Sequence, residues 1–161
     1  MKIYRIASSH SIVYHNTSPE NVFLVERNGL KINQEWGKSM GAKETIEQIY
    51  GMRPVFVGLT PDKFKGARDV TLKIDVTGLD MVADIPSLYD KRAYYDMEQD
   101  LMWFEEANVP LQLLDYVDEN GAIYFSDLLN PNNPLVDICI NLTQTAAIEQ
   151  SIEPSRIQVL G

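Results

Sequence analysis

The sequence predicts an α+β fold built on a mainly antiparallel or mixed β-sheet. Several short segments are rich in Val, Ile and Tyr, which is typical of strands. The expected helices come early and in the middle of the chain, without the regular strand–helix alternation of a parallel sheet. The 161 residues, of which 45% are hydrophobic, suffice for one domain with its own core. We therefore expect a single domain over residues 1–161.

The first elements are two strands and a helix. Strands are expected over residues 2–6 and 11–14, which are rich in Ile, Val and Tyr. A helix should begin after Ser18, whose hydroxyl can cap its first turn, and Pro19 suits the first helical position. Gly29 should end this helix, because glycine tolerates a positive φ. Removing the Ser18 hydroxyl is then expected to cost about 1 kcal/mol.

The middle of the chain should contain one more helix, two strands and an insertion. A helix is expected over 43–50 and strands over 54–60 and 69–76, the second of which alternates apolar and polar residues. Residues 86–119 are acidic and are expected to form a helical insertion that Pro110 interrupts.

The last part of the sequence indicates further strands. They are expected over 122–125, 136–142, 145–150 and 156–160, with a loop over residues 130–134.

Composition and charge exclude several classes of protein. The 23 Asp and Glu against 14 Lys and Arg give a net charge of −9, so a broad basic surface for nucleic acid is not expected. Cys139 is the only cysteine, which excludes an internal disulfide and a cysteine-rich zinc site, and we expect no metal. No apolar run is long enough for a membrane span or a signal peptide, so we expect a cytoplasmic protein.

The segment around His15 is the main candidate for chemistry, because the common catalytic and nucleotide-binding motifs are absent. Tyr14-His15-Asn16-Thr17 stands at the end of a strand and directly before a capped helix. An imidazole, a hydroxyl and a helix N-terminus at such a junction can contact a ligand. Alternatively, His15 packs at the strand end and bonds locally.

Four segments, in this order, resemble the ADP-ribosyltransferase superfamily. The first, Val13–Asn21 followed by Asn28-Gly29-Leu30, resembles the "YHGTS…GL" of many small bacterial and phage members. The second, Val55–Asp62, resembles the family's "VYLTPD", and the third, Thr71–Leu79 with Asp84 after it, resembles "VLKVDVSGL…D". The tail, Ser151–Leu160, resembles "IPPERIKVL". Residues 86–142 lie outside the resemblance.

The resemblance implies a split, twisted β-sheet that holds NAD⁺ as a substrate. In the family, a His on the first strand holds the nicotinamide ribose, a Tyr stacks on nicotinamide, and a Glu near the last strand polarises the ribose. Bond cleavage then passes through an oxocarbenium-like state that a carboxylate stabilises. The residues that this implies for NAD⁺ contact are Tyr14, His15, Asn16, Thr17, Phe56 and Thr60, and those for catalysis are His15 and Glu149.

Two of the family's positions are changed in this sequence. The family Tyr falls at Gly58, and Phe56, two residues away on the same face, can stack instead. The family Glu falls near Thr145; Glu149 is the acid that can replace it, whereas Glu153 stands at a family proline and is expected in a turn. A transferase with these residues requires Glu149 and His15 to face the same cleft.

Three further interpretations stay open. One is a catalytically degenerate member that binds a nucleotide, or a partner protein through the acidic surface of 86–119. Another interpretation is a protein that resembles the RNA 2′-phosphotransferase branch of the same fold. Its phosphate-binding groups would be Arg5, Arg53 and Arg156. The third is an unrelated α+β domain. The doublets Tyr94-Tyr95 and Trp103-Phe104 suit either an aromatic platform or, on a helix, the core.

Overall fold

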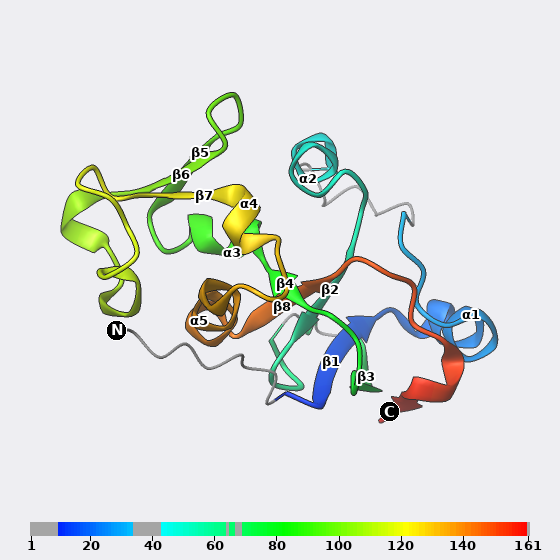
Figure 1. Ribbon diagram of the computed structural model, residues 1–161. Coiled ribbons are helices and arrows are strands. Elements are labelled where there is room, and N and C mark those ends of the chain that lie inside the picture. Colours follow the sequence, from blue (N-terminus) through cyan, green and yellow to red (C-terminus); the bar gives the residue numbers. More distant parts are fainter. Residues whose placement is uncertain (1–9, 34–42, 64, 67–68, 161) are drawn as a thin grey trace.

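The protein is α+β, as expected, and its sheets are antiparallel throughout the residues described. The computed structural model describes residues 10–33, 43–63, 65–66 and 69–160. They form a six-stranded sheet of order β4-β8-β2-β1-β3-β9 and a three-stranded sheet of order β5-β6-β7. In Figure 1 the three-stranded sheet stands at the left, beside α3 and α4, and α1 lies at the opposite end near the C-terminal residues.

The two central strands of the six-stranded sheet, β1 and β2, are paired much less extensively than their neighbours. Its strands are β1 (Ile12–Thr17), β2 (Val55–Gly58), β3 (Val70–Asp75), β4 (Val82–Ala83), β8 (Thr145–Ile148) and β9 (Ile157–Val159). All six residues of β1 pair with β3, but β1 and β2 share a single registered pair, Tyr14 with Gly58. The sheet therefore consists of two well-paired halves, β1-β3-β9 and β4-β8-β2, that meet at one point.

Strand pairing divides the sheet's residues between two faces, because paired residues lie on the same face and neighbours alternate. We call one the His15 face; it carries Val13, His15, Val55, Val57, Leu72, Ile74, Ala146 and Ile148. We call the other the Phe56 face; it carries Tyr14, Asn16, Phe56, Gly58, Thr71, Lys73, Thr145 and Ala147.

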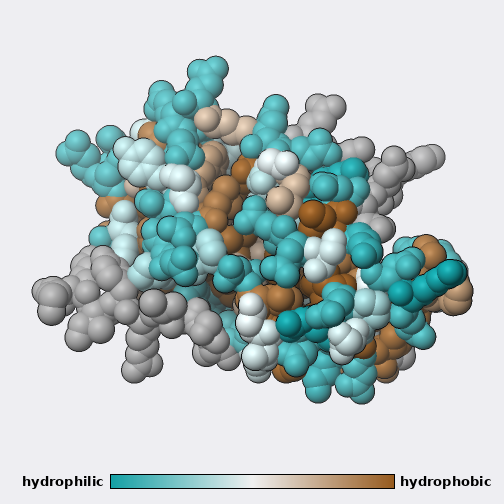
Figure 2. Space-filling model, turned by 45° about the vertical axis from the view of Figure 1, so that its right-hand side comes forward, coloured by the Kyte–Doolittle hydropathy of each residue, from teal (hydrophilic) through white to brown (hydrophobic). Residues whose placement is uncertain are grey.

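Helices cover both faces with apolar side chains. The helices are α1 (Val22–Asn28), α2 (Lys43–Tyr50), α3 (Ile85–Tyr89), α4 (Phe125–Leu128) and α5 (Pro134–Thr143). Val25 of α1 and Ile140 of α5 pack with the apolar residues of the His15 face. Tyr50 of α2 packs in a second cluster that includes Ala147 and extends to the three-stranded sheet. On the view in Figure 2, hydrophilic residues predominate, and hydrophobic side chains show through near the middle and at the lower right.

The predicted β1–α1 unit is confirmed, except for its cap. Pro19 begins a single 3₁₀ turn, η1 (Pro19–Asn21), which continues into α1, and Gly29 ends the helix with φ = 76°. The Ser18 side chain makes no capping bond; its Oγ instead accepts a hydrogen bond from Asn21 Nδ2 at 2.9 Å. The cap prediction was wrong, since Asn21 competes for the hydroxyl that would have bound the backbone.

Several predicted elements are confirmed with shifted ends. The predicted helix 43–50 is α2. The strands predicted over 11–14, 54–60, 69–76, 122–125, 145–150 and 156–160 overlap β1, β2, β3, β7 (Ala122–Tyr124), β8 and β9, respectively, and β1 extends beyond its predicted end to Thr17. The strand predicted over residues 2–6 lies outside the described residues.

The prediction of a helical insertion over 86–119 was wrong. After the five residues of α3, the segment forms the hairpin β5 (Ala93–Asp96) and β6 (Leu101–Phe104), which continues into β7. Two 3₁₀ turns follow β6, η2 (Glu106–Asn108) and η3 (Leu111–Leu113). The physical reason is that burial alternates along the paired strands, with Ala93, Met102 and Phe104 on the inner face, which is the period of a strand and not of a helix.

The prediction of a strand over 136–142 was also wrong, because these residues lie in α5. Asn133 caps this helix by accepting from Leu135 N at 2.9 Å, and Pro134 occupies its first turn. Val136 and Ile140 enter one core cluster, and Leu135 and Cys139 enter the other. This i, i+4 pattern outweighs the strand preference of the β-branched residues.

Candidate functional site

His15 lies where the two halves of the six-stranded sheet separate. Its Nδ1 lies 2.7 Å from the carbonyl oxygen of Phe56, on the neighbouring strand β2. A carbonyl only accepts hydrogen bonds, so Nδ1 carries the proton in this contact. No described residue is hydrogen-bonded to Nε2, which is thus the ring's remaining acceptor.

The surroundings of His15 keep its imidazole neutral. Burial lowers the pKa of His15, although the bond to the Phe56 carbonyl and the negative charge of Asp69 act in the opposite direction. Asp69 stands just before β3, and its Oδ2 accepts from Gly66 N at 2.7 Å. Asp69 was not among the residues predicted for the site. The sequence shows only that Asp69 begins the predicted strand over 69–76, and the structure shows that this strand, β3, pairs with β1.

The residues next to His15 point to different sides of the sheet. Thr17 shares the His15 face, whereas Tyr14 and Asn16 belong to the Phe56 face. Asn16 Nδ2 donates to Thr71 Oγ1 at 3.0 Å and to the carbonyl of Pro61 at 3.1 Å. The Asn16 amide thus ties β1 to β3 and to the turn that follows β2.

The residues expected to flank nicotinamide are on the Phe56 face. The Phe56 ring meets the Tyr50 ring edge to face, with centroids 5.8 Å apart. At Gly58, a Cβ would lie 2.6 Å from Lys63 Cβ, so a larger side chain at the family's Tyr position would have to displace Lys63. Thr60 is exposed in the turn after β2.

Glu149 is placed with Tyr50 and not with His15. It directly follows Ile148, the last residue of β8, and so lies just beyond the registered pairs of the sheet. Burial raises the pKa of the Glu149 carboxyl, and its charge contributes to the raised pKa of Tyr50, for which burial is the largest cause. The charge of Glu149 thus acts on Tyr50, whereas the carboxylate whose charge acts on His15 is Asp69.

A buried carboxylate lies beside Thr145, the position nearest to the family's Glu. Asp84, 3% exposed, accepts from Ser87 N at 3.1 Å and from Ser87 Oγ at 2.6 Å. Burial raises the pKa of Asp84, and hydrogen bonds from Ser87 and Thr145 oppose this. Asp84 caps α3, so its contacts have a structural explanation.

The arginines considered for phosphate binding have protein partners. Arg156 Nη1 donates to the carbonyls of Asp75 and Thr77 at 3.2 and 2.9 Å, which ties the turn before β9 to the end of β3. Arg53 Nε lies 3.1 Å from Glu47 Oε1. Glu153 is exposed before η4 (Pro154–Arg156), as expected for a turn, and pairs with Arg156. Arg5 lies outside the described residues.

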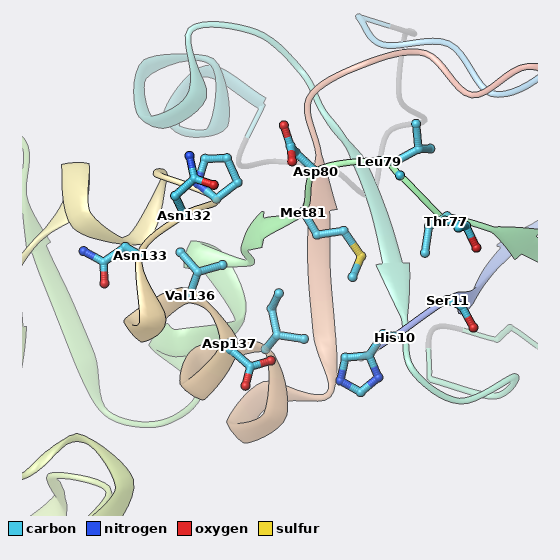
Figure 3. A pocket seen from close by; sticks show the side chains of 14 residues that line it. His10, Ser11, Thr77, Leu79, Asp80, Met81, Asn132, Asn133, Val136 and Asp137 are labelled. Atoms are coloured by element: carbon cyan, nitrogen blue, oxygen red, sulfur yellow. The ribbon is translucent and has the colours of Figure 1, made fainter. Parts of the chain in front are cut away.

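A hollow of about 380 Å³ lies away from His15, between the end of β3 and α5. In Figure 3, Val136 and Asp137 of α5 line one side, and His10 and Met81 approach from the other. None of the residues that the family resemblance assigns to NAD⁺ lines this hollow. His10 Nε2 lies 3.1 Å from Oδ1 of Asn141 on α5.

The described part of the chain offers no metal centre and no membrane helix. Nowhere in it do three or more His, Cys, Asp or Glu side chains gather as metal ligands. None of its helices has the length and apolar character needed to cross a bilayer. Cys139 is buried, which raises the pKa of its thiol to about 12 and keeps it protonated.

Comparison with known proteins adds no assignment. No protein-family model, no curated protein and no solved structure gives a significant match to this chain. The functional argument therefore depends on the residues and on the resemblance of the four segments.

Proposed function

We propose that this protein binds NAD⁺ beside His15 and transfers ADP-ribose to an acceptor, as the resemblance to the ADP-ribosyltransferase superfamily implies. In this reaction the bond between nicotinamide and ribose C1′ breaks, and neutral nicotinamide leaves with the bonding electrons. A nucleophile of the acceptor bonds to C1′ and loses its proton to solvent or to a base.

The orientation of His15 is the observation that supports this proposal most. A neutral imidazole whose Nδ1–H is held by the Phe56 carbonyl presents Nε2 as an acceptor. A ribose hydroxyl is a matching donor. Thr17, two residues along the same face, offers a hydroxyl for a second polar contact.

Calorimetric titration with NAD⁺ tests the binding step. His15→Ala should weaken binding about tenfold, the effect of losing one well-placed hydrogen bond and its neighbouring contacts. His10→Ala is the matched control, because His10 lies in the separate hollow and should leave the dissociation constant unchanged. Thermal unfolding of each variant checks that the fold is retained. Equal affinities in the wild type and His15→Ala would refute the assignment.

A second candidate is a nucleotide-binding or protein-interaction module without catalysis. The placement of Glu149 near Tyr50 favours it, because Glu149 is not among the groups whose charge acts on His15. Asp69 is the carboxylate whose charge acts on His15. Nicotinamide release separates the two candidates: a transferase releases it, and the module binds NAD⁺ without releasing it.

Variants of the two carboxylates sharpen this test. If Asp69 stabilises the positive charge that develops on the ribose, Asp69→Asn should slow nicotinamide release at least tenfold while Glu149→Gln leaves it nearly unchanged. The reverse result would show that Glu149 reaches the substrate and would overturn the placement argued here.

A further inference from the structure

The three-stranded sheet has one buried face and one open face. The side chains that point inward are almost fully buried: Ala93, Met102, Phe104 and Ile123. Alternation sends their neighbours outward, which separates each aromatic doublet. Tyr94 and Trp103 lie outside, whereas Tyr95 and Phe104 turn toward the core.

The open face presents aromatic side chains close together. Tyr94 of β5 is paired directly with Trp103 of β6, and Tyr124 of β7 is diagonal to Trp103. Directly opposed residues on one face lie about 5 Å apart and diagonal ones about 7–8 Å, within reach of aromatic rings. Tyr94 is 49% exposed and Tyr124 56% exposed, and Trp103 between them is partly exposed. We call Tyr94, Trp103 and Tyr124 the aromatic face.

Carboxylates stand at both ends of the aromatic face. Asp96, Glu98 and Asp100 lie at the turn that joins β5 to β6. At the other end, Tyr94 donates its hydroxyl to Glu105, and Asn108 Nδ2 donates to the second oxygen of Glu105 at 2.8 Å. Residues 90–119 contain nine Asp and Glu against two basic residues, Lys91 and Arg92. Much of the protein's charge of −9 is therefore concentrated here.

We propose that the aromatic face binds an arginine-rich segment of a partner protein. A guanidinium can stack on the face of Trp or Tyr while its N–H groups bind carboxylates at the edge. An exposed aromatic surface bordered by negative charge suits such a cation better than it suits an anionic nucleic acid strand. This inference is independent of the NAD⁺ site, which lies in the other sheet.

A fluorescein-labelled hexa-arginine peptide is the probe, with anisotropy measured at 0.15 M salt. Trp103→Ala should weaken binding about tenfold, and Trp103→Phe, which keeps an aromatic ring, should weaken it less than about threefold. Tyr124→Ser is a second variant that is expected to fold normally, because Tyr124 is largely exposed. Phe23→Ser is the matched control, since Phe23 is 67% exposed on α1, outside the three-stranded sheet.

The charged border is tested separately. Glu98→Gln should weaken binding of the peptide by a few-fold, and Asp62→Asn, an exposed acid in the turn after β2, should not. Hexalysine, with equal charge but no planar group, should bind more weakly than hexa-arginine.

Three results with the peptides would overturn the proposal. They are the absence of hexa-arginine binding up to millimolar concentration, equal binding by the wild type and Trp103→Ala, and equal affinity for hexalysine and hexa-arginine. Trp103-dependent binding of a labelled oligothymidylate in place of the peptide would also overturn it, because the aromatic face would then serve single-stranded nucleic acid.

Discussion

The two sheets of this protein differ in how many of their faces are buried. Every residue of β8 in the six-stranded sheet is buried, and in β2 only Phe56 is partly exposed. In β6 of the three-stranded sheet, by contrast, buried and partly exposed residues alternate. The β4-β8-β2 half of the six-stranded sheet thus lies between layers of side chains, whereas the three-stranded sheet covers the core with one face only.

Because of this difference, polar and aromatic side chains have different requirements for hydrogen-bond partners in the two sheets. Within the six-stranded sheet, His15 bonds to the Phe56 carbonyl and Asn16 to Thr71, because burying an unpaired polar group is costly. On the open face of the three-stranded sheet, Trp103 and Tyr124 need no such partner. We therefore expect nucleotide chemistry in the first sheet and recognition of a partner on the second.

The largest expected effect compares buried and open positions. Ile148→Ala in β8 and Met102→Ala in β6 should each lower the free energy of unfolding by about 2–5 kcal/mol, since both side chains are 0% exposed. Tyr124→Ala should cost less than about 1 kcal/mol. Denaturant titration measures all three. An equal loss for Tyr124→Ala would show that the face described as open is covered.

The next effect compares two glycines that directly follow helices, Gly29 after α1 and Gly51 after α2. Gly29→Ala should cost about 3 kcal/mol or more, because φ is +76° and the added Cβ would overlap the carbonyl oxygen of Ile152. Gly51→Ala is the control: φ is +73°, but no atom lies within 4 Å, so only about 1 kcal/mol of backbone strain is expected. Equal losses of unfolding free energy would contradict the close contact of Gly29 with Ile152.

A smaller effect should depend on pH. The pKa of His15 lies below its ordinary value of 6.5, so below about pH 6.5 the unfolded chain binds a proton that the folded chain resists. Stability is therefore lost as pH falls toward the pKa of folded His15. The wild type should lose more unfolding free energy between pH 7.5 and 5.5 than His15→Gln.

Two features keep the His15 experiment specific. The raised pKa of Asp84 acts in the opposite direction, but it cancels from the difference because both proteins retain Asp84. Leu111→Ser, a change at an exposed residue without an ionisable group, is the control and should follow the wild-type curve. A His15→Gln curve identical to that of the wild type would mean that His15 is not desolvated in the folded protein.

The smallest effect compares two helix starts. Ser18→Ala should cost less than about 0.5 kcal/mol, because its hydroxyl bonds only to the exposed Asn21 side chain. Asn133→Ala should cost about 1 kcal/mol, since its side chain caps α5. Melting temperatures compare the two. A larger loss for Ser18→Ala would restore Ser18 as the cap of the helix after β1.

Elements with strong local signals could be predicted from the sequence. The β1–α1 unit combines a β-branched strand with Pro19 and Gly29, and β3 alternates apolar and polar residues. Misassignments occurred where local signals conflict. Residues 130–134 were expected as a loop and the β-branched residues that follow favour a strand, but Asn133 caps α5 and packing on both core clusters decided the outcome.

The candidate site was predictable only as a list of residue types. The sequence shows that His15 stands at a strand end before a helix. It also shows that Glu149 is the acid available near Thr145, where the family's Glu falls. Whether they meet depends on strand pairing: a shift of one residue moves a side chain to the other face. Here the charge of Glu149 acts on Tyr50, whereas Asp69 lies within electrostatic reach of His15.

By itself, the sequence determined the α+β class, the acidic surface and the strand that carries His15, because composition and short-range periodicity are local properties. Tertiary structure alone decided that β1 and β2 meet at one residue pair, that Phe56 orients His15, and that Trp103 faces outward while Phe104 faces the core. These features arise from contacts between segments far apart in the chain. No local propensity encodes such contacts, since their register is set by the burial of both partners together.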